Sequence, residues 1–170
     1  MKDAQGREIK YLRVSVTDRC NLRCKYCMPN GIECVEHKDI LSFEEIRQIA
    51  ACGARLGITK IRLTGGEPLA RKGCPELIHM LKEIPGIEKI AMTTNGTLVR
   101  AILPELVEAG LDEINISLDT LDPGRFAAIT GQDLLPEVLL AIDAALAAGL
   151  KVKVNAVSMP DTDWKRLITL

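Results

Sequence analysis

The stretch CNLRCKYC, residues 20–27, decides how this sequence is interpreted. Its three cysteines follow a C-x3-C-x2-C spacing, and an aromatic residue, Tyr26, precedes the last of them. An iron–sulfur cubane normally takes four cysteines, so three closely spaced thiolates would leave one iron without a protein ligand. That iron could bind and reduce a small molecule, as an open coordination position does in other catalytic metal sites.

A structural zinc site is the main alternative for these cysteines, with Cys34 or His37 as the fourth ligand. Such sites usually contain two C-x2-C pairs, or one pair with histidines, and this sequence has one such pair, Cys24 and Cys27. We expect no disulfide framework, because the sequence shows no signal peptide and has an intracellular α/β pattern. The spacing therefore favours the cluster.

Composition limits the function classes. The 170 residues are 47% hydrophobic, enough for one core, and we expect one domain over residues 1–170. The net charge of −1 and the 3% aromatic content argue against a nucleic-acid partner. No apolar run is long enough to span a membrane, since Pro136, Glu137 and Asp143 interrupt the most hydrophobic stretch, 134–150. We expect a cytoplasmic protein with no membrane partner.

Strand-like and helix-like segments alternate along the chain. A capping box at Ser42–Glu45 and prolines at 75, 123 and 136 mark helix starts. This alternation predicts parallel, right-handed βαβ units and the α/β class. The predicted strands are Tyr11–Val16, Lys60–Thr64, Ile87–Thr94, Asp112–Leu118 and Leu150–Val157.

Each predicted strand has one apolar and one polar face, because successive side chains point in opposite directions. Parallel strands buried on both faces are normally apolar throughout, so we expect a sheet that curves around a wet lumen, with an open, one-side-solvated sheet as the alternative. Three cations, Arg13, Arg62 and Lys153, share the polar face with one carboxylate, Asp119. That excess favours an anionic ligand such as a phosphate ester.

Unusual motifs follow the strands. Thr64–Pro68 (TGGEP), Thr93–Gly96 (TTNG) and Ser117–Asp119 (SLD) come at the ends of the second, third and fourth strands. Ligands of parallel α/β folds bind at the carboxyl ends of the strands. The cysteine stretch follows the first strand, so all four segments should meet at one rim.

Together with residues 12–19 (LRVSVTDR), 61–69 (IRLTGGEPL), 114–119 (INISLD) and 130–133 (TGQD), these motifs resemble the GTP 3′,8-cyclase (MoaA) family of radical S-adenosylmethionine (SAM) enzymes. The resemblance runs in order from about Gly6 to Val157. It implies an incomplete TIM-type barrel of parallel βα units with five of about six strands. It also implies conversion of GTP to (8S)-3′,8-cyclo-7,8-dihydroguanosine 5′-triphosphate in molybdenum cofactor biosynthesis.

The resemblance further implies roles for individual residues. A [4Fe–4S] cluster would be held by Cys20, Cys24 and Cys27. SAM would be contacted by Tyr26, Gly66 and Ser117, and Glu67 lies in the element that holds its amino group. GTP would be contacted by Arg13, Arg62, Thr93 and Lys153. An electron donor is required, and a homodimer is possible in the full-length family.

Members of that family are longer and carry a second three-cysteine cluster. We therefore expect residues 1–170 to be a radical SAM core domain truncated before the last strand and the second-cluster region, with incomplete activity. Cys52 is expected to be a core thiol on a helix, and Cys34 and Cys74 to be loop residues without an assigned role. His37 and His79 are expected at the surface or in packing. A different radical SAM reaction on a peptide or tetrapyrrole, and a zinc-stabilised nucleotide-binding module, remain alternatives.

Overall fold

The computed structural model describes residues 2–27, 35–159, 162 and 164–168. Within these residues, five strands form one parallel sheet in the order β1-β2-β3-β4-β5. This order confirms the α/β class and the predicted alternation. The strands are β1 (Tyr11–Ser15), β2 (Lys60–Thr64), β3 (Lys89–Thr94), β4 (Glu113–Ser117) and β5 (Lys151–Asn155).

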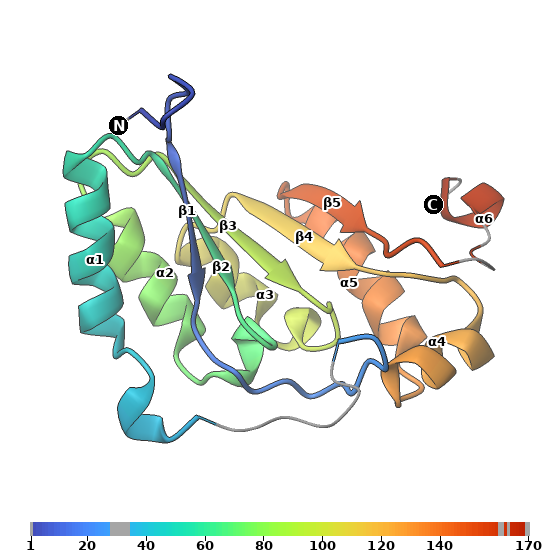
Figure 1. Cartoon of the computed structure of the whole chain (residues 1–170). Coiled ribbons are helices and arrows are strands. Elements are labelled where there is room, and N and C mark those ends of the chain that lie inside the picture. Colours follow the sequence, from blue (N-terminus) through green and yellow to red (C-terminus); the bar gives the residue numbers. More distant parts are fainter. Residues whose placement is uncertain (1, 28–34, 160–161, 163, 169–170) are drawn as a thin grey trace.

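Four helices follow the strands in sequence and cover one face of the sheet (Figure 1). They are α1 (Phe43–Arg55), α2 (Cys74–Lys82), α3 (Val99–Glu108) and α5 (Leu135–Ala147). A further helix, α4 (Pro123–Thr130), lies at the carboxyl end of the strands beside the cysteine stretch (Figure 1). The shorter elements are η1 (His37–Asp39), η2 (Pro68–Ala70) and α6 (Trp164–Ile168).

The predicted start of α1 is confirmed. The Ser42 hydroxyl accepts a hydrogen bond from the Glu45 backbone N–H over 3.2 Å, and the Glu45 carboxylate accepts one from the Ser42 N–H over 2.7 Å. This reciprocal capping box satisfies two backbone donors that a helix start leaves free. Gly57, just beyond the helix, has a φ of +94°, a conformation that glycine adopts without steric cost.

The predicted alternation of strand faces is also confirmed. Apolar residues of β2, β3 and β4 point beneath the helices and are fully buried: Ile61, Leu63, Ile90, Met92, Ile114 and Ile116. The opposite face of the sheet carries no helix among the described residues (Figure 1). We call this the lumen face, and its side chains include Arg13, Arg62, Thr93, Asn115 and Lys153.

Two expectations about single cysteines were wrong. Cys52 is exposed on α1, because the buried stripe of that helix runs through Ile46 and Ala50 and turns Cys52 to the other side. Cys74 is not a loop residue but the buried first residue of α2. Cys34 lies outside the described residues. As expected, His79 is exposed; it lies 3.6 Å from Glu83 on the surface of α2.

None of the described helices is long and apolar enough to cross a lipid bilayer.

Candidate active site

The rim loops meet around one cavity of about 620 Å³ at the carboxyl ends of the strands. All three cysteines of the CNLRCKYC stretch line it, together with residues from the ends of β2, β3 and β4. The structure therefore brings the predicted cluster ligands beside most of the predicted SAM contacts. The lining includes Cys20, Cys24, Tyr26, Cys27, Gly65, Gly66, Thr93, Thr94, Asn95 and Ser117.

The glycines of the TGGEP motif let two backbones approach closely. The Gly66 N–H donates to the Thr17 carbonyl over 2.7 Å, and the Glu67 N–H donates to the Arg19 carbonyl over 2.8 Å. A Cβ atom on Gly66 would lie 2.3 Å from the Arg19 carbonyl oxygen, far inside any tolerated contact. These glycines therefore fix the segment that leads into the first cysteine, Cys20.

Glu67 ties the same motif to the end of β3. Its side chain is fully buried, and its carboxylate accepts hydrogen bonds from the Thr94 hydroxyl (2.8 Å) and the Asn95 N–H (2.7 Å). The Leu69 N–H donates a third bond over 3.1 Å. Burial raises the pKa of Glu67, while these donors oppose the shift. The carboxylate thus positions the rim, and a role of its motif in SAM binding stays a prediction.

The thiols of Cys20 and Cys24 lie in a setting that disfavours their thiolates in the metal-free protein. Burial raises the pKa of Cys24 to about 11, and the nearby Cys20, Asp119 and Cys27 add to this rise. Burial also raises the pKa of Cys20. A bound metal centre would supply the positive charge that deprotonates such thiols. The site therefore suits a cationic centre more than free thiolates.

A zinc ion and an iron–sulfur cluster place different demands on their cysteine ligands. Among the described residues, no group of three or more His, Cys, Asp or Glu side chains is placed to hold one metal ion. A zinc ion requires its sulfur ligands at about 2.3 Å from a single atom. A cubane instead offers several irons to its cysteines, which then stand further apart around the cluster. The three thiols line one cavity together, as the ligands of a single cluster would. The zinc alternative needs Cys34, which lies outside the described residues, or His37 as a further ligand.

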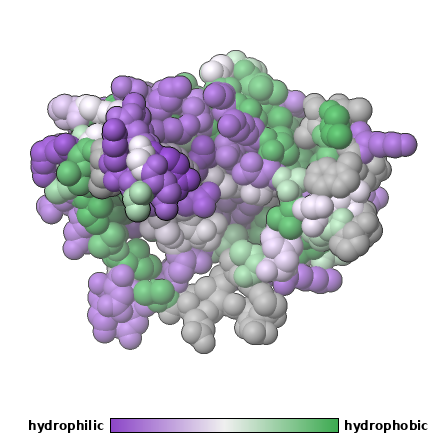
Figure 2. Space-filling view, turned by 45° about the horizontal axis from the view of Figure 1, so that its top comes forward, coloured by the Kyte–Doolittle hydropathy of each residue, from purple (hydrophilic) through white to green (hydrophobic). Residues whose placement is uncertain are grey.

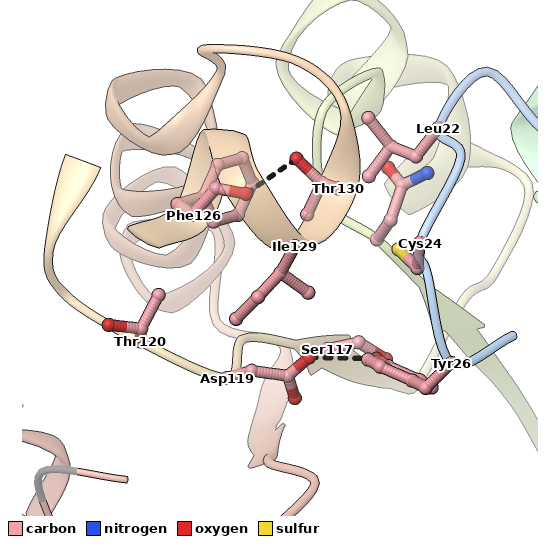
Figure 3. Close-up of a pocket in the computed structure, with 10 residues that line it drawn as sticks. Leu22, Cys24, Tyr26, Ser117, Asp119, Thr120, Phe126, Ile129 and Thr130 are labelled. Carbon is pink, nitrogen blue, oxygen red and sulfur yellow. Dashed lines mark hydrogen bonds between the residues drawn. The ribbon is translucent and has the colours of Figure 1, made fainter. Parts of the chain in front are cut away.

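Tyr26 and Asp119 connect the cysteine stretch to the end of β4. The Tyr26 hydroxyl donates to Asp119 over 2.7 Å, and the second Asp119 oxygen accepts from the Val157 N–H over 2.8 Å. Burial and the Asp119 carboxylate raise the pKa of Tyr26. The two side chains border a smaller cavity between the cysteine stretch and α4 (Figure 3). Asp119 is thus engaged at the rim and does not neutralise the cations of the lumen face.

The four residues predicted to contact GTP lie on the lumen face. Arg13 and Arg62 are partners in the β1–β2 register, while Thr93 and Lys153 flank Asn115 of β4. The Arg62 guanidinium is largely buried, donates to the Thr93 hydroxyl over 3.3 Å and lies 5.9 Å from the centre of the Tyr11 ring. Arg62 and Thr93 are therefore one hydrogen-bonded unit.

A buried carboxylate on the lumen face, Glu113, was missed in the sequence. Its side chain is 4% exposed and forms an ion pair of 2.5 Å with Lys60. Arg62 Nη2, Lys89 Nζ and Lys151 Nζ lie 3.8, 3.8 and 3.9 Å from its oxygens. The Lys60 ammonium holds the pKa of Glu113 below its usual range. Glu113 lies two residues before Asn115 on β4, so the alternation of side chains along a strand places both on the lumen face. This alternation could have identified Glu113 from the sequence.

Because several cations share one carboxylate, the lumen face keeps a positive excess after Glu113 is paired. Lys89 and Lys151 are exposed at the amino-terminal ends of their strands. Figure 2 turns that end of the molecule toward the viewer, and hydrophilic side chains occupy the upper middle of the surface. The excess of cations over the single carboxylate of Glu113 therefore supports the predicted preference for an anionic ligand.

Comparison with known proteins identifies the family. The model of the radical SAM superfamily matches residues 14–170. The chain belongs to this superfamily. Radical SAM enzymes use a [4Fe–4S] cluster and SAM, the two cofactors that the cysteine spacing and the resemblance predicted.

Relatives of known function are similar over nearly the whole chain. A GTP 3′,8-cyclase of Heliobacterium modesticaldum is 53% identical over 161 residues, which are 94% of this chain and 49% of the relative. A GTP 3′,8-cyclase of Thermodesulfovibrio yellowstonii is 54% identical over 162 residues, 94% of this chain and 50% of the relative. The chain thus spans about half the length of the curated relatives it matches.

Solved structures confirm the fold. The enzyme anSMEcpe with bound AdoMet superposes with a TM-score of 0.68 at 19% identity, over 86% of this chain and 42% of the other. Methylornithine synthase (PylB) superposes with a TM-score of 0.67 at 21% identity, over 86% of this chain and 44% of the other. At these identities the likeness concerns the fold alone, and it supports the incomplete parallel barrel.

Proposed function

We propose that this chain is the cluster- and SAM-binding part of a GTP 3′,8-cyclase, a lyase that makes (8S)-3′,8-cyclo-7,8-dihydroguanosine 5′-triphosphate for molybdenum cofactor biosynthesis. One combined observation carries the proposal. The cysteine-lined cavity opens beside a lumen face whose cations exceed its carboxylates, in a chain about half identical to GTP 3′,8-cyclases.

The cofactors would occupy the rim cavity. Cys20, Cys24 and Cys27 would each bind one iron of the cluster, and Tyr26, Gly66 and Ser117 would contact SAM. When bound, the two cofactors supply a one-electron reduction that yields a radical able to abstract hydrogen from ribose. An electron donor would supply the electron that this reduction consumes.

The remaining steps depend on this chain's own residues. Arg13, Arg62 and Lys153 would bind the triphosphate by charge-assisted hydrogen bonds, which are the stronger kind. Thr93 holds the Arg62 guanidinium and would orient it toward the phosphates. Such positioning lowers the entropic cost of bringing the ribose to the radical source.

Further parts of the proposal follow the family. Residues 1–170 would form one radical SAM core domain, with a second cluster in the region of the relatives that this chain does not cover. We place the protein in the cytoplasm, where thiols stay reduced and available to bind iron. A homodimer is proposed for the full-length form.

The function is tested by SAM cleavage in the reduced, reconstituted chain. We expect 5′-deoxyadenosine to form, and its rate to rise when GTP is added but not when ATP is added. A GTP-independent rate would favour a different radical SAM reaction. Absence of both SAM cleavage and GTP binding would contradict the proposal.

A further inference from the structure

The TGQD motif, residues 130–133, has no assigned role in binding either cofactor or GTP, yet it lies against the cysteine stretch. Its first residue, Thr130, is the last residue of α4. In Figure 3, Ile129 and Thr130 of α4 face Leu22 and Cys24 across the smaller cavity. A motif far along the chain is therefore a direct neighbour of the predicted cluster ligands.

Two backbone hydrogen bonds join α4 to the cysteine stretch. The Arg23 N–H donates to the Thr130 carbonyl over 2.8 Å, and the Lys25 N–H donates to the Ile129 carbonyl over 3.0 Å. These bonds lie on either side of Cys24. The position of the middle cysteine is therefore set by the end of α4.

Gln132 adds a side-chain bond at the first cysteine. Its amide nitrogen donates to the carbonyl of Asn21, the residue after Cys20, over 3.0 Å. The turn that brings Gln132 there requires Gly131, whose φ is +81° and which ends α4. The Thr130 hydroxyl donates to the Gln132 carbonyl over 3.0 Å and stabilises this turn.

Asn21 is held from the opposite side as well. Its side-chain oxygen accepts from the Asn95 amide over 2.9 Å, and its side-chain nitrogen donates to the Thr97 hydroxyl over 2.8 Å. Asn95 and Thr97 belong to the loop after β3. Asn21 is thus fixed between the loop after β3 and the end of α4, by three separate hydrogen bonds.

We propose that Gln132 is a positioning residue for the cysteine stretch. By holding the Asn21 carbonyl, it keeps the Cys20–Cys24 segment in the arrangement that retains the iron–sulfur cluster. Gln132 acts through Asn21 and does not itself contact the cluster. The inference rests on the proposed function and adds to it. Of the two measurements below, only the release of iron depends on that function.

The test compares Gln132→Met, which removes the amide donor at similar side-chain length, with wild type. The matched control is Gln48→Met, which makes the same change at an exposed glutamine of α1. Hydrogen exchange of the Arg23 and Lys25 amides is measured in the metal-free chain. Release of iron to a chelator is measured after anaerobic reconstitution.

We expect Gln132→Met to exchange both amides and release iron about two- to tenfold faster, the loss that one net hydrogen bond predicts. The control should match wild type, and the thermal midpoint of both variants should stay near that of wild type. Wild-type exchange and iron release in Gln132→Met would overturn the inference. If wild type itself takes up no iron, the proposed function fails, while the exchange measurement still decides the role of Gln132.

Discussion

The buried carboxylate of Glu67 accepts a 2.7 Å hydrogen bond from the backbone N–H of Asn95, and so joins the loop after β2 to the loop after β3. Asn95 in turn donates to Asn21 of the cysteine stretch. The arrangement of the rim loops therefore depends on a series of hydrogen bonds that begins at the fully buried side chain of Glu67. Disturbing Glu67 should loosen loops that it does not touch.

The Glu67→Gln variant tests this dependence. The carboxylate accepts from three donors, the Leu69 N–H, the Thr94 hydroxyl and the Asn95 N–H. In the variant an NH2 group replaces one carboxylate oxygen and cannot accept, so at least one buried hydrogen bond is lost. We expect a decrease of about 1–3 kcal/mol in the free energy of unfolding, measured by urea denaturation of the metal-free chain. The exposed Glu108→Gln variant, at the end of α3, is the control and should be close to neutral. A neutral Glu67→Gln would show that the carboxylate does not hold the rim together.

Gly66→Ala tests the close approach of the two backbones. The new Cβ would meet the Arg19 carbonyl, so either the TGGEP loop or the cysteine stretch must move. We expect a loss of about 1–3 kcal/mol in stability, as for other overpacked sites, and reduced iron uptake. Gly124→Ala, near the start of α4 with no backbone atom of another segment near its Cβ position, is the control. Equal behaviour of the two alanine variants would contradict the proposed fit.

Arg62→Ala and Lys153→Ala test the lumen face as the phosphate site. Each variant removes a charge-assisted hydrogen bond, worth about 1.5–3 kcal/mol, or about ten- to a hundredfold in affinity for GTP. Cluster content should not change, because neither side chain lines the rim cavity. Arg47→Ala on the exposed side of α1 is the matched control. Unchanged GTP affinity in both lumen variants, measured by equilibrium dialysis, would place the phosphates elsewhere.

Glu113 gives a prediction about pH. Lys60 lowers the pKa of this carboxyl below its ordinary value of 4.5, so the unfolded chain binds a proton at this residue more readily than the folded chain. The ion pairs of Glu113 therefore stabilise the fold above pH 4.5 and lose this effect as the pH falls below it. The stability difference between wild type and Glu113→Gln should be constant above that pH and shrink below it. A difference that does not depend on pH would contradict this role.

Local patterns predicted the strands of this fold well, because period-two alternation and helix caps depend on neighbouring residues. Lys60–Thr64 has the predicted bounds, and the capping box of Ser42 and Glu45 is present. Strand parity alone placed Arg13, Arg62, Thr93 and Lys153 on one face of the predicted sheet, where they lie. These are the features for which short stretches of sequence suffice.

Features that depend on distant contacts were not predictable in this way. The carboxylate of Glu67 is satisfied by donors from two other segments, and Gln132 reaches a carbonyl 111 residues earlier in the chain. Glu113 was missed because it is the first residue of β4. The alternation of apolar and polar side chains was followed only from Ile114 onward. Cys52 was misplaced although the helical period of α1 shows its position, because Ile46 and Ala50 define the buried stripe and Cys52 lies on the other side.

The most direct test of the account is the metal content of the chain after anaerobic reconstitution with iron and sulfide. We expect about four irons per chain, the stoichiometry of a cubane, with an oxygen-sensitive brown absorbance. Cys24→Ser should abolish the cluster, whereas Cys52→Ser, which changes an exposed thiol on α1, should keep it. Stoichiometric zinc without iron uptake, or full iron uptake in Cys24→Ser, would contradict the central claim.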